Sequence, residues 1–265
     1  MQNAIPRAWC LIPVVAIAAV LAGCQSRSVA TSPSGTAGSV SDGPDGPRYV
    51  ITVGHADADI VGTTGRAIQL AIDAVAQRGG GEVRVKAGEY LLTDSVRLRP
   101  HVHLIGERGR TILKRGPLVC SELAVDADKG QRQITPVDAG AFKPGMGVVT
   151  WDKKRRWLTQ SRAYTVTEVR DGVLHLHDLL TADRIAMDGG RVINHFALVL
   201  AERADHAVID GFIVDAAVDD PDELLRGLRA GVVYVWRSRH VTVRHVKAIN
   251  GHGDGSGSAI VENNY

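Results

Sequence analysis

Hydrophobic residues recur at helical spacing in one part of the chain and at every second position in the parts that follow. The helical pattern covers residues 64–77, where the apolar side chains fall on one stripe: Ala67, Ile68, Ala71, Ile72 and Val75. This spacing predicts an amphipathic helix, with Thr63 or Thr64 as its N-cap and Gly79-Gly80-Gly81 at its end.

The segments after this helix alternate apolar and polar residues and are separated by turns of Gly, Pro or Asp. The alternation predicts short strands at residues 83–85, 88–90, 96–98, 102–104 and 112–113, with no helix between them. Short strands without intervening helices indicate an all-β body.

An internal repeat indicates how later strands are arranged. Residues 197–212 align without gaps onto residues 231–246, and a third pass begins near residues 257–261. Four matched pairs carry the alignment: Val199 and Val233, Arg203 and Arg237, His206 and His240, and Ile209 and Val243. Because one pass is too small to bury its apolar side, the repeat favours stacked coils, with the paired histidines as structural positions. A meandering antiparallel sandwich is the alternative.

The beginning of the body resembles a known family. The segments Ala67-Ile68-Gln69, Gly79-Gly80-Gly81-Glu82-Val83, Gly88-Glu89-Tyr90 and Leu104-Ile105-Gly106 are similar to the start of pectate-lyase-superfamily proteins. The resemblance covers about residues 50–115 and implies a right-handed parallel β-helix whose N-terminal end is capped by the amphipathic helix. It is more specific for the fold than for the chemistry, because the family includes lyases, hydrolases, epimerases and binding proteins.

Residues 120–192 depart from the coil pattern. Alternating runs on both sides of Asp171-Gly172 predict an antiparallel hairpin, so we expect a β-rich insertion between the early and the later coils. One of its loops carries candidates to stack on sugars and hold their carboxylates: Trp151, Arg155, Arg156 and Trp157. A solvated basic turn with locally packed tryptophans is the alternative.

Composition narrows the class of protein. The 265 residues include 31 Lys+Arg and 29 Asp+Glu, a net charge of +2, which excludes a strongly basic nucleic-acid binder. The 29 glycines and the 5% of aromatic residues are typical of a turn-rich β protein. The sequence motifs of phosphate-binding loops, zinc proteases and serine esterases are absent. Of the three cysteines, Cys120 is expected to be a small buried hydrophobic residue.

The first 47 residues differ from the rest of the chain. Arg7 precedes an apolar run, and the following Leu21-Ala22-Gly23-Cys24 resembles the lipobox of bacterial lipoproteins. That resemblance implies a signal peptide and lipidation of Cys24; an ordinary signal peptide cleaved elsewhere is the alternative. The residues up to Pro47 are small and polar, so we expect a flexible tether at a bacterial membrane, on its periplasmic face or at the cell surface.

Two clusters are candidates for chemistry. The first is the loop between the repeat units, whose carboxylates could supply the oxygen ligands of calcium: Asp215, Asp219, Asp220, Asp222 and Glu223. Lyases with the resembled fold use calcium to neutralise a substrate carboxylate, and Arg203 or Arg237 is then the candidate base. An acidic surface loop without a metal is the alternative.

The second cluster is Asn250-Gly251-His252-Gly253-Asp254-Gly255, which follows a coil strand. Its Gly-His-Gly resembles a loop of the galacturonan hydrolases, so His252 and Asp254 are candidate catalytic residues. Asp215 or Asp220 would be the second carboxylate that a glycosidase needs. A glycine-rich turn in which Asp254 accepts backbone hydrogen bonds is the alternative.

These patterns predict five parts: a signal peptide at 1–23, a lipidated tether at 24–47, the capping helix and first coils at 48–119, the insertion at 120–192, and later coils at 193–265. We expect a monomeric lipoprotein that acts on an acidic polysaccharide by lyase- or hydrolase-type cleavage. A non-catalytic β-helix that binds glycan or serves as a scaffold is the alternative. Because the third pass stops at Tyr265, we expect incomplete C-terminal coils, as in a fragment.

Overall fold

The computed structural model describes residues 39–43, 46–154, 163–217, 231–251 and 260–261. This part of the chain is mostly β, with one α-helix, α1 (Gly65–Gln77), and a short 3-10 helix (Ala186–Asp188). Within it, no helix combines the length and the apolar character that a membrane crossing requires.

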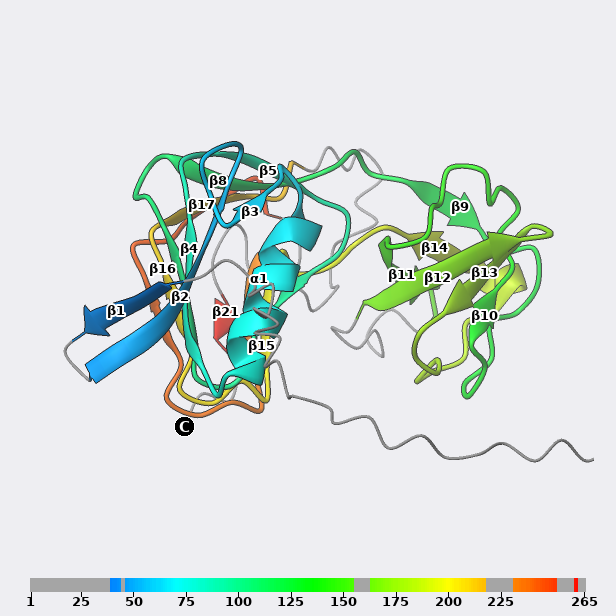
Figure 1. Ribbon diagram of the computed structural model, residues 1–265. Helices are drawn as coiled ribbons and strands as arrows, with labels where there is room; N and C mark the ends of the chain where they lie inside the picture. Colours follow the sequence, from blue (N-terminus) through cyan, green and yellow to red (C-terminus); the bar gives the residue numbers. More distant parts are fainter. Residues whose placement is uncertain (1–38, 44–45, 155–162, 218–230, 252–259, 262–265) are drawn as a thin grey trace, which may run out of the picture. The chain divides into compact units, whose positions relative to one another are not determined.

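Three sheets built from parallel strands form the larger part of the structure (Figure 1). The first contains β2 (Gly46–Gly54), β4 (Gly81–Val85), β7 (Val102–Gly106), β16 (Val208–Asp210) and β19 (Thr242–Arg244), with β3 (Ile60–Val61) beside β2 and β1 (Ser39–Gly43) antiparallel to β2. The second contains β5 (Gly88–Leu92), β8 (Thr111–Arg115), β17 (Phe212–Asp215) and β20 (Lys247–Ile249). The third contains β6 (Val96–Arg97), β15 (Val199–Glu202), β18 (Val233–Trp236) and β21 (Ile260–Val261).

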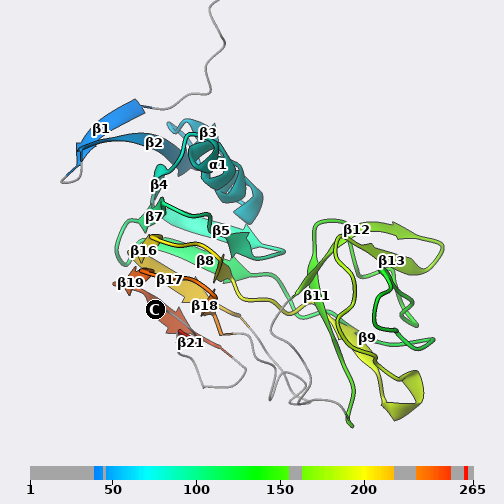
Figure 2. The ribbon, with the colours of Figure 1, turned by 90° about the horizontal axis from the view of Figure 1, so that it is seen from below.

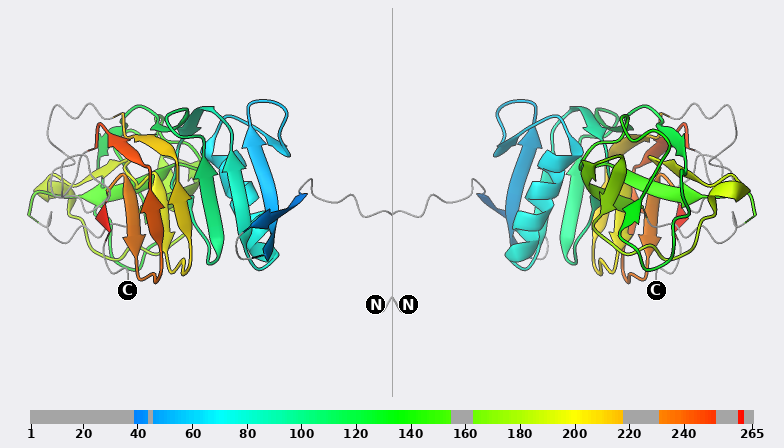
Figure 3. Two further views of the ribbon diagram at one scale, coloured as in Figure 1. Left: turned by 90° about the vertical axis from the view of Figure 1, so that its left-hand side faces the viewer. Right: turned by 90° about the vertical axis from the view of Figure 1, so that its right-hand side faces the viewer.

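The chain visits these sheets in a fixed order. Its successive passes are β4-β5-β6, β7-β8-β15, β16-β17-β18 and β19-β20-β21, and each pass adds one strand to each sheet. The strands of the first sheet therefore follow one another from β4 to β19 (Figures 2 and 3). Val199 pairs with Val233 and Ile209 with Val243, so the predicted repeat register is confirmed.

Aliphatic side chains line up from pass to pass and form the core. In the first sheet the strand registers place five residues in one ladder: Ile51, Val83, Leu104, Ile209 and Val243. The first four of these are fully buried, and Val243 is half-buried against the same core. Burial of each such side chain contributes about 1.5–3 kcal/mol, so the ladders hold the passes together.

Helix α1 has the predicted stripe, since the five apolar residues of the pattern are its buried ones. Thr64 is the N-cap residue, which confirms one of the two predicted positions, although its side chain makes no capping hydrogen bond. Two glycines of the cluster are required by sterics, the first of them because a Cβ on Gly81 would lie 2.2 Å from the carbonyl oxygen of Tyr49. A Cβ on Gly80 would lie 2.6 Å from the Cβ of His101.

Gln69 of α1 acts as a partner for the edge of β6. Its Oε1 accepts a hydrogen bond from the backbone N–H of Arg97 at 2.7 Å, and its Nε2 donates to the Arg97 carbonyl at 3.1 Å. A single side-chain amide thus replaces the two backbone groups that a neighbouring strand would offer.

Between β8 and β15 the chain forms an antiparallel sheet with a core of its own. Its order is β10 (Gln133–Ile134), β13 (Val173–Leu176), β12 (Tyr164–Arg170), β11 (Gly147–Trp151), β14 (Arg191–Ile193) and β9 (Cys120–Glu122). The predicted hairpin at Asp171-Gly172 is confirmed, because β12 pairs with β13 across it. Cys120 is exposed, so the expectation that it is buried is wrong; it lies at an end of β9, a strand that pairs only with β14 among the described residues.

Candidate functional site

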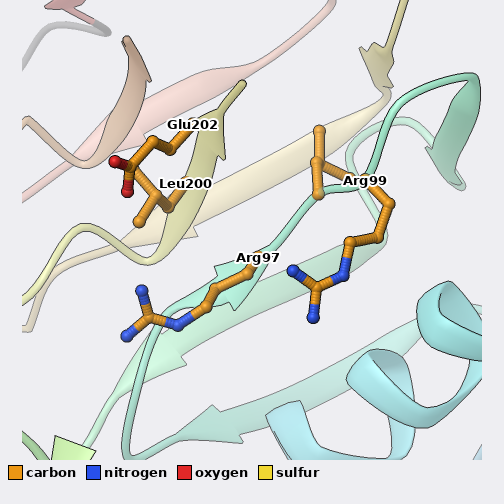
Figure 4. Close-up of a pocket in the computed structure, with 5 residues that line it drawn as sticks. Arg97, Arg99, Leu200 and Glu202 are labelled. Carbon is orange, nitrogen blue, oxygen red and sulfur yellow. The ribbon is translucent and has the colours of Figure 1, made fainter. Parts of the chain in front are cut away.

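A small groove lies where β6 and β15 pair in the third sheet (Figure 4). Its volume is about 110 Å³, and it is lined by Arg97, Leu98, Arg99, Leu200 and Glu202. Arg97 and Leu200 are register partners that alternate with the core residues Val96 and Val199. The groove is therefore on the outer side of the sheet, where strand alternation directs polar side chains.

Arg97 is held on both its backbone and its side chain. Besides the two hydrogen bonds with Gln69, its Nη2 lies 3.3 Å from Thr165 Oγ1 and 3.4 Å from Asp94 Oδ1. Thr165 in turn donates to Asp94 Oδ2 at 2.5 Å. Because the contacts to Asp94 are long, the guanidinium keeps donors for a further partner.

Arg99 and Glu202 complete the charged lining of the groove. Arg99 Nε donates to Asp73 at 2.9 Å, and 47% of its side chain is exposed. Glu202 has no ion pair among the described residues. Figure 4 shows both arginines reaching from β6 and the segment after it, whereas Leu200 and Glu202 come from β15.

An aromatic residue lies beside the groove on the next strand. Trp236 of β18 is the register partner of Glu202, and the guanidinium of Arg237 lies 4.3 Å from the centre of its indole ring. Guanidinium groups bind carboxylates in bidentate fashion, and indole rings pack against apolar faces of ligands. The arrangement suits a ligand that carries both carboxylates and apolar ring faces.

Sequence reasoning missed Arg97, Arg99 and Glu202. A signal existed, because Val96-Arg97-Leu98-Arg99 alternates and its two arginines must share a face. The repeat did not indicate Glu202, because the residue that pairs with Glu202 in the next pass is Trp236 and not a second carboxylate.

Of the predicted residues that it describes, the structure brings Arg203 and Arg237 to adjacent passes and leaves Asp215 in another sheet. Arg203 and Arg237 occupy equivalent exposed turns after β15 and β18, with φ of 53° and 51°. Asp215 lies in the second sheet, at the end of β17, where its Oδ1 accepts hydrogen bonds from Asn250 Nδ2 and the Ala217 N–H. Asp215 is thereby engaged away from the groove.

Trp151 is not placed as predicted. It belongs to β11 rather than to a loop, and only 9% of it is exposed, because it packs into the hydrophobic core. A buried indole cannot stack on a sugar, so Trp151 is removed from the candidate ligand contacts.

The other predicted site residues lie outside the described residues: Cys24, Arg155, Arg156, Trp157, Asp219, Asp220, Asp222, Glu223, His252 and Asp254. In the part that is described, no group of three or more His, Cys, Asp or Glu side chains is arranged to hold a metal ion.

A buried arginine holds the chain where it leaves the antiparallel sheet and enters β15. Arg115 at the end of β8 lies 2.8 Å from His195 Nδ1 and donates to the carbonyl oxygen of Phe196 at 2.6 Å. Its guanidinium also lies 4.9 Å from the Phe196 ring. Burial lowers the pKa of Arg115 to about 10, so it stays charged at neutral pH. Arg115 fixes the path of the chain into the strand that carries Leu200 and Glu202.

Comparisons with known proteins give structural similarity only. No protein-family model matches this chain, and no curated protein matches it. Three solved structures to which it is similar are bacteriophage tailspikes: gp54 of Acinetobacter baumannii phage AP22 in complex with A. baumannii capsular saccharide (13% identity, TM-score 0.27), gp61 of Pseudomonas phage phi297 (12%, 0.29) and gp49 of Pseudomonas phage LKA1 (14%, 0.27). The matches cover 71%, 73% and 79% of this chain, and 35%, 41% and 38% of those chains.

The chain thus spans well under half the length of each tailspike. Superpositions with TM-scores this low do not establish a common fold or a common ligand.

Proposed function

We propose that this chain winds as a right-handed parallel β-helix and binds an acidic polysaccharide in the groove between β6 and β15. The observation that carries the proposal is the pair Arg97 and Arg99, two cations on one face that line the groove together with Glu202, which has no ion pair among the described residues. The resemblance of residues 50–115 to the pectate-lyase superfamily supports the same ligand class. In this arrangement Arg97 and Arg99 hold carboxylates of the ligand, and Trp236 packs against a sugar ring.

Cleavage of the bound chain is the second candidate, and the acid–base groups around the groove favour it. In an elimination, a guanidinium neutralises the substrate carboxylate and a base removes the proton from the adjacent carbon. The electron pair of the broken C–H bond forms a carbon–carbon double bond as the bond from the next carbon to the glycosidic oxygen breaks, and the departing oxygen takes up a proton, so the product is unsaturated. Arg203 and Arg237, on the turns after β15 and β18, are candidate bases, and calcium held by the loop after Asp215 would be the additional cation. In a hydrolysis, Glu202 would be one of the two carboxylates required.

The binding test compares groove variants with a matched arginine elsewhere. With polygalacturonate as the ligand and neutral dextran as the blank, we expect R97A and R99A each to weaken binding about tenfold or more, which corresponds to the loss of a charge-assisted contact. R170A, at an exposed arginine paired with Glu168 in β12, should leave binding unchanged. Equal affinities of R97A, R99A and R170A would rule out this groove.

The product assay separates the enzyme from the binding module. A rise in absorbance from unsaturated uronide that disappears with a chelator supports calcium-dependent elimination, and D220A should abolish it. Reducing ends without that absorbance support hydrolysis. Retention of polygalacturonate without any product supports a non-catalytic glycan-binding protein.

We also propose that the chain is exported and anchored to a bacterial membrane by lipid on Cys24. Several acyl chains contribute about 0.8 kcal/mol per buried methylene, which gives stable attachment. Replacement of Cys24 by Ala should move the protein from the membrane fraction to the soluble fraction; a variant that stays in the membrane fraction would exclude lipid attachment at this residue.

A further inference from the structure

Three histidines stack on one another along the turns that follow β6, β15 and β18. The ring centres of His101 and His206 are 5.1 Å apart with planes inclined by 8°, and those of His206 and His240 are 4.7 Å apart with planes inclined by 19°. The stacking of His206 on His240 confirms the prediction from the repeat; His101 extends the stack into the preceding pass. All three side chains are exposed.

The backbone of these turns fixes the stack. Each histidine has a left-handed φ, of 60°, 58° and 55° in chain order, so the same turn recurs in three passes. The N–H of His101 donates to the Asp205 carbonyl, and the N–H of His206 donates to the Arg239 carbonyl, both at 2.9 Å. The rings are therefore held at the spacing of successive strands, about 4.8 Å.

Two side chains strengthen the link between the last two turns. The buried Ser238 Oγ accepts from the Ala204 N–H at 3.0 Å and lies 3.0 Å from the Ala201 carbonyl oxygen. Asp205 Oδ1 accepts from the Arg239 N–H at 2.8 Å. Both contacts join one pass to the next and hold the two turns against each other.

The surroundings of the stack are strongly cationic. The exposed basic residues on these turns form a surface that we call the basic ledge. Its members are Arg99, His101, Arg203, His206, Arg237, Arg239 and His240. The carboxylates near it among the described residues are Asp205, on the same turn as His206, Asp73 of α1, which already binds Arg99, and Glu202, which lines the groove with Arg99. At the other end of the stack, His101 rests on Gly80, next to Arg78, whose guanidinium covers the ring of Tyr49.

Residues of the basic ledge directly follow, in the sequence, residues at or beside the groove. Glu202 precedes Arg203, Trp236 precedes Arg237, and Arg99 itself lines the groove. A polymer that lies in the groove and extends toward these turns would meet cations at a regular spacing, which suits a ligand with a charge on each repeating unit.

Protonation of the histidines would change what this ledge binds. Imidazole is the side chain whose charge ordinarily changes between pH 5 and 8. Two adjacent protonated rings at these separations repel each other, and the neighbouring arginines add to that repulsion. Carboxylates of a bound polyanion would relieve it, so proton binding and polyanion binding must favour each other by thermodynamic linkage.

We infer that the basic ledge is a second binding segment for the acidic polysaccharide, and that the stacked histidines make this binding stronger at acidic pH. The inference rests on the proposed function, because the groove supplies the ligand that the ledge extends to hold. The pH dependence of binding tests the basic ledge, whereas the affinities of R97A and R99A test the groove.

The test measures binding of polygalacturonate to the full chain by calorimetry at about pH 8 and about pH 5.5, at one ionic strength. We expect the wild type to bind about tenfold tighter at the lower pH and to take up protons on binding, detected in buffers of different ionisation enthalpy. The variant H101N/H206N/H240N should lose both the gain in affinity at the lower pH and the uptake of protons. Asn is chosen because it tolerates a left-handed φ.

The controls separate this inference from the groove proposal. H177N removes an exposed histidine of the antiparallel sheet and should keep the full acid gain. If the triple variant unfolds at lower temperature than the wild type, H206N alone removes the central ring and should lose most of the gain. An unchanged gain in the triple variant and in H206N, or no gain in a wild type that binds at both pH values, overturns the proposed role of the basic ledge. Weaker binding by R97A, whose residue belongs to the groove and not to the basic ledge, together with an acid gain in the wild type supports both proposals, and a wild type that binds at neither pH overturns both.

Discussion

Asp210 receives hydrogen bonds from two side chains of the next pass. It lies at the end of β16, with Arg244 Nε at 2.9 Å, His245 Nδ1 at 2.8 Å and Arg108 Nε at 3.9 Å from its carboxylate oxygens. Burial by itself would raise the pKa of Asp210, but hydrogen bonds from His245 and Arg244 and their charges outweigh burial and hold this pKa below its usual value. One carboxylate thus links two neighbouring coils at their turns.

This contact predicts how stability changes with acid. Because the pKa of Asp210 is lower in the folded protein than in the unfolded chain, its stabilising contribution is present above the unfolded value, about 4, and is lost as the pH falls through the folded value. We expect D210N to lower the free energy of unfolding at pH 7 by about 1–3 kcal/mol and to show a smaller loss between about pH 5 and 3 than the wild type. Urea denaturation at several pH values measures both effects.

The matched control is D178N, since Asp178 has a similar contact with His177 in a more exposed position. Exposed pairs contribute little, so D178N should change stability by less than about 1 kcal/mol. A D210N protein as stable as the wild type at pH 7 would contradict the assignment.

At the scale of elements, the sequence predicts what depends on local pattern. The stripe of α1, the hairpin at Asp171-Gly172 and the register of Ile209 on Val243 all follow from spacing, because the hydrogen-bond geometry of helices and strands imposes it. The alternation at residues 96–99 could have indicated the two arginines of the groove, but the contacts that position Arg97 depend on residues distant in sequence. Thr165, which fixes Asp94, is 71 residues away from it, and no pattern within one segment contains that pairing.

The contact of Gln69 with Arg97 of β6 also joins residues that are distant in sequence, and a substitution can test it. Replacement of Gln69 by Ala leaves the N–H and carbonyl of Arg97 without this partner, and we expect a loss of about 1–3 kcal/mol in the free energy of unfolding. Exchange of the Arg97 amide hydrogen should become faster in the native state. Q77A, at an exposed glutamine of the same helix, should leave both quantities unchanged. Slow exchange of that amide in Q69A would show that another group protects the strand edge.

At the scale of the whole molecule, stability depends on the position of a residue in the stack. Each inner residue of the first sheet is covered by the passes on both sides, so its burial depends on two neighbours. Val83 lies between Ile51 and Leu104 and is fully buried, whereas Val243 contacts Ile209 on one side and stays half-buried.

The same substitution at these two valines therefore measures the coupling between passes. We expect V83A to lower the free energy of unfolding by about 2–3 kcal/mol, from two lost methylene equivalents and the cavity that they leave, and V243A to lower it by about 1 kcal/mol. Chemical denaturation with a probe in each half of the stack measures the change and shows whether the halves unfold together. If the passes form one cooperative stack, V83A shifts a single transition for both probes. Equal losses of unfolding free energy in V83A and V243A, or an unfolding transition confined to the first passes, would contradict a stack in which neighbouring passes stabilise one another.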